Sequence, residues 1–276
     1  MLSGIQNLPE ISIVTEKLPG STSDPQFSFT IKAVDTKYNL DRVNVFVNNV
    51  PVYGFQGIDL RDKKIQQLDQ QLSINLSSGK NKVQVSCLNE KGVESLLETI
   101  EIDNSAKSQK PTLYVAVVSV SSYANAAMNL KYAAKDGRDL VNMFVRSGWF
   151  DKVVVDSLLN KKATKENIQE LRKKFMQTSV NDQVILFISG HGLLDEYLDF
   201  YFATHDVDFK NPAGRGLRYD DLENLLDGIP ARKKLLLMDA CHSGEVDKSR
   251  IQINQTPLIS KNTRGTVTTY TYPADV

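Results

Sequence analysis

Short runs in which apolar and polar residues alternate fill the first part of the chain. Residues 27–31 (Phe-Ser-Phe-Thr-Ile) and 43–47 (Val-Asn-Val-Phe-Val) are the clearest examples. A period of two predicts strands that bury one face. Polar turn segments at 48–49 and 77–81 interrupt the runs, a further strand is expected at 82–87, and roughly seven strands fit between residues 11 and 102. This pattern is typical of a small β-sandwich.

Beyond a polar, aperiodic segment the pattern changes to apolar runs that alternate with helical spacing. Thr164 is placed to cap a helix whose residues Ile168, Leu171 and Phe175 share one face. Strand and helix in alternation predict an α/β domain with a mostly parallel sheet. The expected strands are 113–120, 153–155, 184–188, 200–202 and 235–238, and the expected helices lie within 130–145, 164–175 and 219–226.

The change of pattern predicts two domains. We expect a β-sandwich over residues 1–103, a linker over 104–110 that runs into Pro111, and an α/β domain over 111–276.

Charge and hydropathy narrow the class of protein. Lysine plus arginine number 33 and aspartate plus glutamate 33, so no global field attracts nucleic acid or an anionic membrane. The sequence has no long apolar run of membrane-spanning type, and its first ten residues lack the features of a signal peptide. These observations predict a cytoplasmic protein without nucleic-acid or membrane partners. The oligomeric state is left open.

Cysteine and histidine are too few for a disulfide framework or a zinc site. Cys87 and Cys241 lie on either side of the expected domain boundary. His191, His205 and His242 show no paired ligand spacing with them, so neither a metal nor another required cofactor is expected.

Two of these residues each follow an apolar segment of strand type. His191 follows residues 184–188 within Ile-Ser-Gly-His-Gly, and Cys241 follows residues 235–238 within Met-Asp-Ala-Cys-His-Ser-Gly. Parallel strands open into ligand-bearing loops at their carboxyl ends, so the two side chains are expected at one end of the sheet. A thiol beside an imidazole predicts a cysteine peptidase.

Each group has an expected role in that chemistry. Cys241 attacks as the thiolate, His191 takes its proton and returns one to the leaving amine, and the amides of Gly192 and Cys241 form the oxyanion hole. A serine nucleophile is a poorer interpretation, because Cys241 and Glu245 occupy the positions where an elbow around Ser243 needs glycine.

The two motifs, fifty residues apart, resemble those of caspase-like peptidases, and more closely their metacaspase branch and bacterial relatives than animal caspases. The resemblance runs from Leu113 onward. It implies a caspase-like fold and cysteine endopeptidase activity. It also implies further strands beyond Val276, so the chain is expected to be truncated. Residues 47–53 and 78–83 look like the immunoglobulin-like modules that precede bacterial caspase-like domains.

Specificity follows from the same resemblance. In metacaspases an aspartate two positions before the nucleophile and another at the start of the first helix line the pocket for the residue that precedes the cleaved bond. The matching residues are Asp239 and Asp136, although Asp136 alone also reads as a solvated helix charge. Two carboxylates suit a guanidinium, so protein or peptide substrates cut after arginine or lysine are expected. Self-processing is implied at Lys248, Arg250, Lys261 or Arg264.

Calcium and catalytic competence stay open. Asp206, Asp208, Asp220 and Asp221 are calcium candidates by composition, but they lack EF-hand spacing and equally suit a solvated surface. The alternatives to an endopeptidase are an inactive caspase-like scaffold that binds partners, and hydrolysis of a nonpeptide acyl bond by the same pair.

Overall fold

A computed structural model describes residues 8–14, 19–107, 110–240, 259–261 and 267–271 of the 276-residue chain. The chain forms two compact units, Met1–Gln109 and Lys110–Val276.

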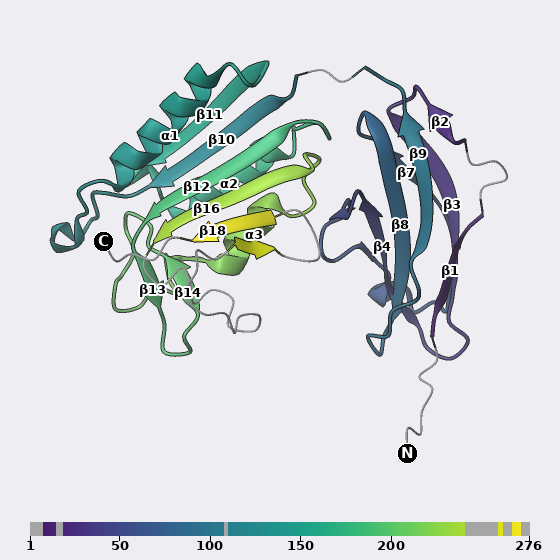
Figure 1. Cartoon of the computed structure of the whole chain (residues 1–276). Coiled ribbons are helices and arrows are strands. Elements are labelled where there is room, and N and C mark those ends of the chain that lie inside the picture. Colours follow the sequence, from purple (N-terminus) through teal and green to yellow (C-terminus); the bar gives the residue numbers. More distant parts are fainter. Residues whose placement is uncertain (1–7, 15–18, 108–109, 241–258, 262–266, 272–276) are drawn as a thin grey trace. The chain divides into compact units, whose positions relative to one another are not determined.

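Antiparallel strands build the amino-terminal unit. One sheet has the order β1-β3-β7, and the other has the order β2-β9-β8-β4-β5, with β6 added to β4 (Figure 1). The pairings are antiparallel apart from β2 with β9. The bounds are β1 Glu10–Ile13, β2 Ser21–Thr22, β3 Gln26–Val34, β4 Leu40–Val47, β5 Val50–Pro51, β6 Ile58–Asp59, β7 Gln67–Asn75, β8 Gly79–Asn89 and β9 Glu98–Asn104, with a 3-10 turn at Arg61–Lys63.

The two sheets share one apolar core. Phe29 and Ile31 of β3 belong to the same buried cluster as Val43 of β4 and Val83 of β8, and all four are at most 1% exposed. The alternate residues of each strand therefore face inward, as the period of two requires. The predicted β-sandwich is confirmed.

Both predicted turns are present, but the second is shorter than expected. Asn48 and Asn49 join β4 to β5 with φ angles of 53° and 67°, the left-handed conformation that a tight hairpin needs. Residues 76–78 separate β7 from β8, whereas residues 79–81 already lie inside β8, where Lys80 pairs with Asp103. The Asn81 side chain holds this short turn, because its Oδ1 accepts from the Ser77 N–H and its Nδ2 donates to the carbonyls of Ser77 and Gly79.

A six-stranded sheet with the order β11-β10-β12-β16-β18-β17 forms the centre of the second unit (Figure 1). Its pairings are parallel except for β17 with β18. The segments are β10 Thr112–Ser119, α1 Ala133–Ser147, β11 Lys152–Leu159, α2 Lys165–Phe175, β12 Gln183–Gly190, α3 Tyr219–Leu226, β16 Lys233–Ala240, β17 Ile259–Lys261 and β18 Val267–Thr271, with 3-10 turns at Ala126–Met128 and Asn160–Lys162.

Helices cover both faces of this sheet. Leu140 and Phe144 of α1 pack on the face that carries Val115 and Val117. The opposite face is covered by α2 and α3, whose buried residues form one cluster with Ala116, Val118 and Leu186. The predicted α/β fold with a mostly parallel, helix-flanked sheet is confirmed.

The helix signals of the sequence are largely confirmed. The Asn167 N–H donates to Thr164 Oγ1 at 3.3 Å, so Thr164 is the cap of α2. The prediction that the first helix includes Leu130 is wrong, since α1 starts at Ala133. The Leu130 N–H instead donates to the Ser121 carbonyl, in a loop that contains the 3-10 turn capped by Asn125.

A separate antiparallel sheet holds the aromatic strand expected at 200–202. Its order is β13-β14-β15, with bounds Gly192–Leu194, Phe200–Phe202 and Leu217–Arg218. The sequence series placed this strand among those of the parallel sheet. It instead turns back on β13, pairing Gly192 with Phe202, because only the five residues 195–199 separate the two strands.

Candidate active site

Polar side chains line up where three neighbouring parallel strands end. Ser119 of β10 pairs with Ser189 of β12, and Ser189 pairs with Asp239 of β16. One step further, Gly190 pairs with Ala240, and His191 follows Gly190. The structure describes β16 as far as Ala240. Cys241, His242, Ser243 and the four basic residues of the predicted processing segment lie outside the described residues or, for Lys261, have no described side chain.

Three hydrogen bonds fix His191. Its N–H donates to Tyr123 Oη at 2.9 Å, and its carbonyl accepts from the Ala203 N–H at 2.9 Å. The ring Nε2 lies 2.9 Å from the Met128 carbonyl. A carbonyl oxygen only accepts, so Nε2 carries the proton in this contact. The lone pair of the neutral ring is then on Nδ1, which makes Nδ1 the basic atom.

Two aromatic rings flank the imidazole. The centroids of Tyr123 and Phe209 lie 5.2 and 5.6 Å from that of His191. Gly190 leaves room for this arrangement, because a Cβ there would lie 2.8 Å from Tyr123 Oη and 3.1 Å from Phe202 Cε2. Sequence reasoning missed Tyr123, Met128 and Phe209, since none of them lies in a motif that signals a contact with His191.

His205 holds the loop that carries Tyr123. Its Nδ1 lies 2.6 Å from the Ser122 carbonyl, its carbonyl accepts from the Ala124 N–H, and its N–H donates to the Ala163 carbonyl. These contacts indicate that His205 stabilises the loop beside the candidate site.

The carboxylate of Asp239 has a partner on the next strand. Ser189 Oγ donates to Asp239 Oδ2 at 3.1 Å, which places both side chains on the face of the sheet that α1 covers. Asp239 is exposed and Ser189 is buried. Ser189 was also missed, although its position two residues before His191 pairs it in register with Asp239.

Asp136 lies on α1 over the same end of the sheet. It is half-buried and precedes Gly137, whose backbone contacts β10 so closely that a Cβ there would lie 2.6 Å from Ser119 Oγ. Because Ser119 and Asp239 are two strands apart in register, about 10 Å separates their backbones. Both predicted pocket carboxylates thus come from elements at the carboxyl end of β10, β12 and β16.

Gly192 is buried and begins β13, directly after His191. It therefore stands at the same end of the sheet as the imidazole.

The four calcium candidates are engaged by protein groups. Asp206 pairs with Arg215, and the Lys210 N–H donates to Asp208 Oδ1 at 2.9 Å. Asp220 lies 3.4 Å from Arg218, and Asp221 lies 3.9 Å from Lys165. No three His, Cys, Asp or Glu side chains gather into a metal-binding group in the part of the chain that the structure describes. No calcium ligand set is assigned from them.

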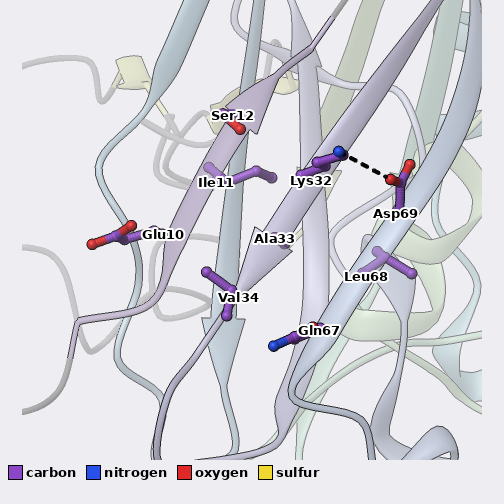
Figure 2. A pocket seen from close by; sticks show the side chains of 9 residues that line it. All are labelled: Glu10, Ile11, Ser12, Lys32, Ala33, Val34, Gln67, Leu68 and Asp69. Carbon is purple, nitrogen blue, oxygen red and sulfur yellow. Dashed lines mark ion pairs between the residues drawn. The ribbon is translucent and has the colours of Figure 1, made fainter.

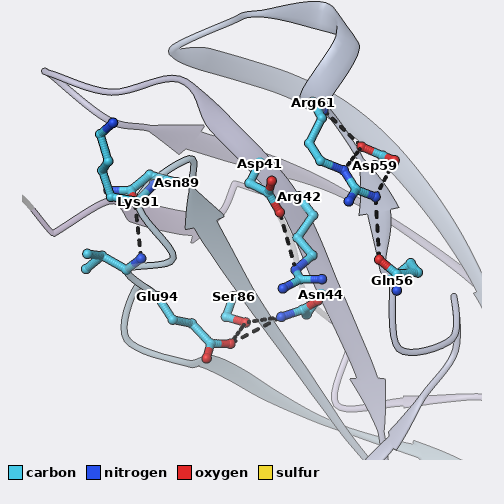
Figure 3. A network of polar contacts seen from close by, with 11 residues as sticks. Asp41, Arg42, Asn44, Gln56, Asp59, Arg61, Ser86, Asn89, Lys91 and Glu94 are labelled. Carbon is cyan, nitrogen blue, oxygen red and sulfur yellow. Dashed lines mark hydrogen bonds and ion pairs between the residues drawn. The ribbon is translucent and has the colours of Figure 1, made fainter. Parts of the chain in front are cut away.

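The amino-terminal unit carries two polar surface features. A shallow hollow of about 530 Å³ lies over β1, β3 and β7, with the Lys32–Asp69 ion pair in its wall (Figure 2). Elsewhere, Ser86 and Asn44 donate to Glu94 Oε1 at 2.6 and 3.2 Å (Figure 3). Near this network, hydrogen bonds from Arg61 hold the pKa of Asp59 at about 2. Neither feature contains a histidine or a cysteine.

The carboxy-terminal unit is thus an α/β domain that gathers a restrained histidine and carboxylates at the carboxyl end of a parallel sheet. Its sequence matches the family model of the caspase domain over residues 112–276, more than half of the chain. The chain therefore belongs to the caspase-domain family of peptidases. A search of curated proteins found no match.

Several solved structures match at low similarity. The fibronectin(III)-like modules of CbhA from Clostridium thermocellum share 13% identity at a TM-score of 0.29, covering 37% of this chain and 50% of theirs. Protein GSU0716 from Geobacter sulfurreducens shares 21% sequence identity at a TM-score of 0.38, covering 48% of this chain and 51% of its own. The PKD domain of an M14-like peptidase from a Thermoplasmatales archaeon shares 16% sequence identity at a TM-score of 0.22, covering 37% of this chain and 95% of its own. The chain spans about half the length of the first two.

Among the described helices, none has the length and apolar character needed to span a membrane. The cytoplasmic location, the metacaspase branch and the immunoglobulin-like nature of the sandwich stay predictions.

Proposed function

We propose that this protein is a cysteine endopeptidase that cleaves after arginine or lysine with Cys241 as nucleophile and His191 as base. The observation that carries the proposal is the restraint of His191. Its Nε2 is held by the Met128 carbonyl at 2.9 Å. His191 directly follows β12, and β12 pairs with β16, the strand that precedes Cys241 in the sequence. The ring therefore offers Nδ1 as the proton acceptor.

The reaction divides into two acyl-transfer steps. The Cys241 thiol gives its proton to His191 Nδ1, and the thiolate adds to the carbonyl carbon of the substrate peptide bond. The tetrahedral oxyanion accepts hydrogen bonds from the amides of Gly192 and Cys241. When the C–N bond breaks, the imidazolium protonates the leaving amine. Water, deprotonated by Nδ1, then hydrolyses the thioester and restores the thiol.

The carboxylates select the substrate. Asp239, oriented by the 3.1 Å hydrogen bond from Ser189, and Asp136 on α1 supply two negative charges at the carboxyl end of the sheet. A guanidinium presents five donors and suits two carboxylates, whereas an aspartate side chain would be repelled. The substrates are thus proteins or peptides with arginine or lysine before the cleaved bond.

The test compares short peptides that differ only in the residue before the cleaved bond, with and without added calcium. Arginine and lysine peptides are expected to be cleaved, and the aspartate peptide at least a hundredfold more slowly. Asp239→Asn, which keeps the shape and the contact with Ser189, lowers kcat/KM for the arginine peptide by about tenfold to a hundredfold.

Cys241→Ala is the matched control for the nucleophile and is expected to be inactive. Equal hydrolysis by Cys241→Ala rejects the mechanism, and a preference for aspartate rejects the acidic pocket. If the wild-type chain cleaves no peptide while it still binds arginine peptides, the protein is an inactive caspase-like scaffold.

A further inference from the structure

The tip of the β13–β14 hairpin presents two large apolar side chains to solvent. Tyr197 is 78% exposed and Leu198 is 56% exposed. They lie side by side in sequence, between Glu196 and Asp199. We name residues 195–199, Asp-Glu-Tyr-Leu-Asp, the acidic tip. Its exposed apolar residues contribute nothing to either described core of the unit.

An ordered turn holds these side chains outward. Asp195 Oδ1 accepts from the N–H groups of Tyr197 and Asp199, at 2.9 Å each. Asp195 and Asp199 also pair through the backbone, and the Leu198 N–H donates to the Asp195 carbonyl at 3.0 Å. Leu198 is fixed with a φ of 65°. A surface that is already ordered loses less conformational entropy when it binds a partner.

The charge around the two apolar residues is negative. Asp195, Glu196 and Asp199 belong to the tip itself, and Asp220 lies close by in the first turn of α3. Arg218 offsets part of this charge, because it lies 3.6 Å from Asp199 and 3.4 Å from Asp220. The balance favours a partner that combines an apolar side chain with lysine or arginine.

The acidic tip is close in the chain to the imidazole. β13 begins at Gly192, the residue after His191, and the hairpin is three residues long on each side. Three residues of extended chain span about 10 Å, so one substrate chain can reach from the imidazole to the tip.

We propose that the acidic tip is a second recognition surface, which binds a basic and apolar segment of protein substrates away from the cleaved bond. This inference rests on the proposed peptidase function and adds a second determinant of substrate choice. A second copy of the chain is a poorer occupant of the tip, because two acidic tips repel each other.

The experiment uses the full chain and two substrates with the same four residues before the cleaved bond. One is a short peptide, and the other continues for about twenty residues with lysine, arginine and leucine. The variant Tyr197→Ser with Leu198→Asn removes the apolar pair, and asparagine tolerates the left-handed backbone at 198. Trp149→Ser is the matched control, since Trp149 is 66% exposed and precedes β11, at the amino end of the strands.

The double variant is expected to lower kcat/KM for the long substrate by about fivefold to twentyfold and to leave the short peptide unchanged. Trp149→Ser changes neither. Glu196→Lys reverses a charge outside the hydrogen bonds of the turn and is expected to lower kcat/KM for the long substrate as well. Equal kcat/KM for the long substrate in the wild type and the double variant overturns the proposal. A concentration-dependent dimer that the double variant abolishes also overturns it, in favour of a second copy.

A binding measurement separates this proposal from the peptidase function. The Cys241→Ala chain is titrated with the fluorescently labelled long peptide, with and without the double variant. A Kd that is about fivefold or more higher in the double variant supports binding of the peptide at the acidic tip, even if no peptide is cleaved. An unchanged Kd rejects binding at the acidic tip. Absence of cleavage of the short peptide by the wild type bears on the peptidase function alone.

Discussion

Replacing Gly137 by alanine sets helix propensity against packing. Alanine in a helix interior is favoured over glycine by about 1 kcal/mol. In this chain the new Cβ would lie 2.4 Å from Val117 Cγ1 and 2.6 Å from Ser119 Oγ. Both atoms belong to β10, the strand on which α1 packs. Ordinary contacts start near 3.5 Å, so α1 has to move by about 1 Å.

Such overpacking costs about 1–3 kcal/mol, and contacts this short belong at the upper end. After the gain in propensity is subtracted, the free energy of unfolding is expected to fall by about 1–2 kcal/mol. The assay is urea unfolding followed by the fluorescence of Trp149, the single tryptophan, which reports on the carboxy-terminal unit. Gly214→Ala is the control, because Gly214 belongs to the same unit and a Cβ there meets nothing within 4 Å. A higher urea midpoint for Gly137→Ala would refute the close packing of α1.

Three further changes test other parts of the account. Arg172→Met removes the 2.7 Å hydrogen bond from Arg172 to the Asp227 carbonyl after α3, and should lower the free energy of unfolding by about 1–2 kcal/mol, measured as a lower urea midpoint. Burial lowers the pKa of Lys234 from 10.5 to about 8, so the unfolded state binds more protons between these values. The free energy of unfolding should therefore rise by roughly 3 kcal/mol as the pH increases from about 8 to 10.5. Urea unfolding of Lys234→Met, measured over the same pH range, should show no such rise. Tyr123→Phe leaves the His191 N–H without its hydroxyl acceptor, and kcat/KM should fall about threefold to tenfold; unchanged steady-state kinetics would remove Tyr123 from the positioning of His191.

The fold was predictable wherever one strand or helix carries its own signal. The alternation at residues 27–31 and the spacing of Ile168, Leu171 and Phe175 both identify elements whose buried faces the structure confirms. The turn expected at 77–81 ends earlier in the structure, because residues 79–81 are polar but already pair in β8, and the Asn81 side chain bonds back to Ser77. The sequence pattern also did not separate the small antiparallel sheet from the parallel one, because the aromatic residues 200–202 suit a strand of either sheet.

The candidate site was predictable only in part. His191 and Asp239 follow from their places after or within apolar strands, and Ser189 was recoverable from the same register. Met128 and Tyr123 contact His191 across more than sixty residues of chain. A backbone carbonyl leaves no mark on residue type, so the restraint of the imidazole needed coordinates. Phe209 likewise reaches the ring from a loop that no periodicity places.

Covalent labelling shows whether His191 activates Cys241 as a nucleophile. The full chain is incubated with two peptidyl acyloxymethyl ketones that differ only in the residue next to the reactive group, arginine in one and aspartate in the other, and the adduct is mapped by mass spectrometry. We expect one adduct on Cys241 from the arginine reagent, much slower labelling by the aspartate reagent, and little labelling in His191→Ala. Cys87 is an internal control, because it is buried and burial raises its pKa to about 11. Labelling of Cys241 by the arginine reagent at equal rates in the wild type and in His191→Ala, or preferential labelling by the aspartate reagent, would contradict these expectations.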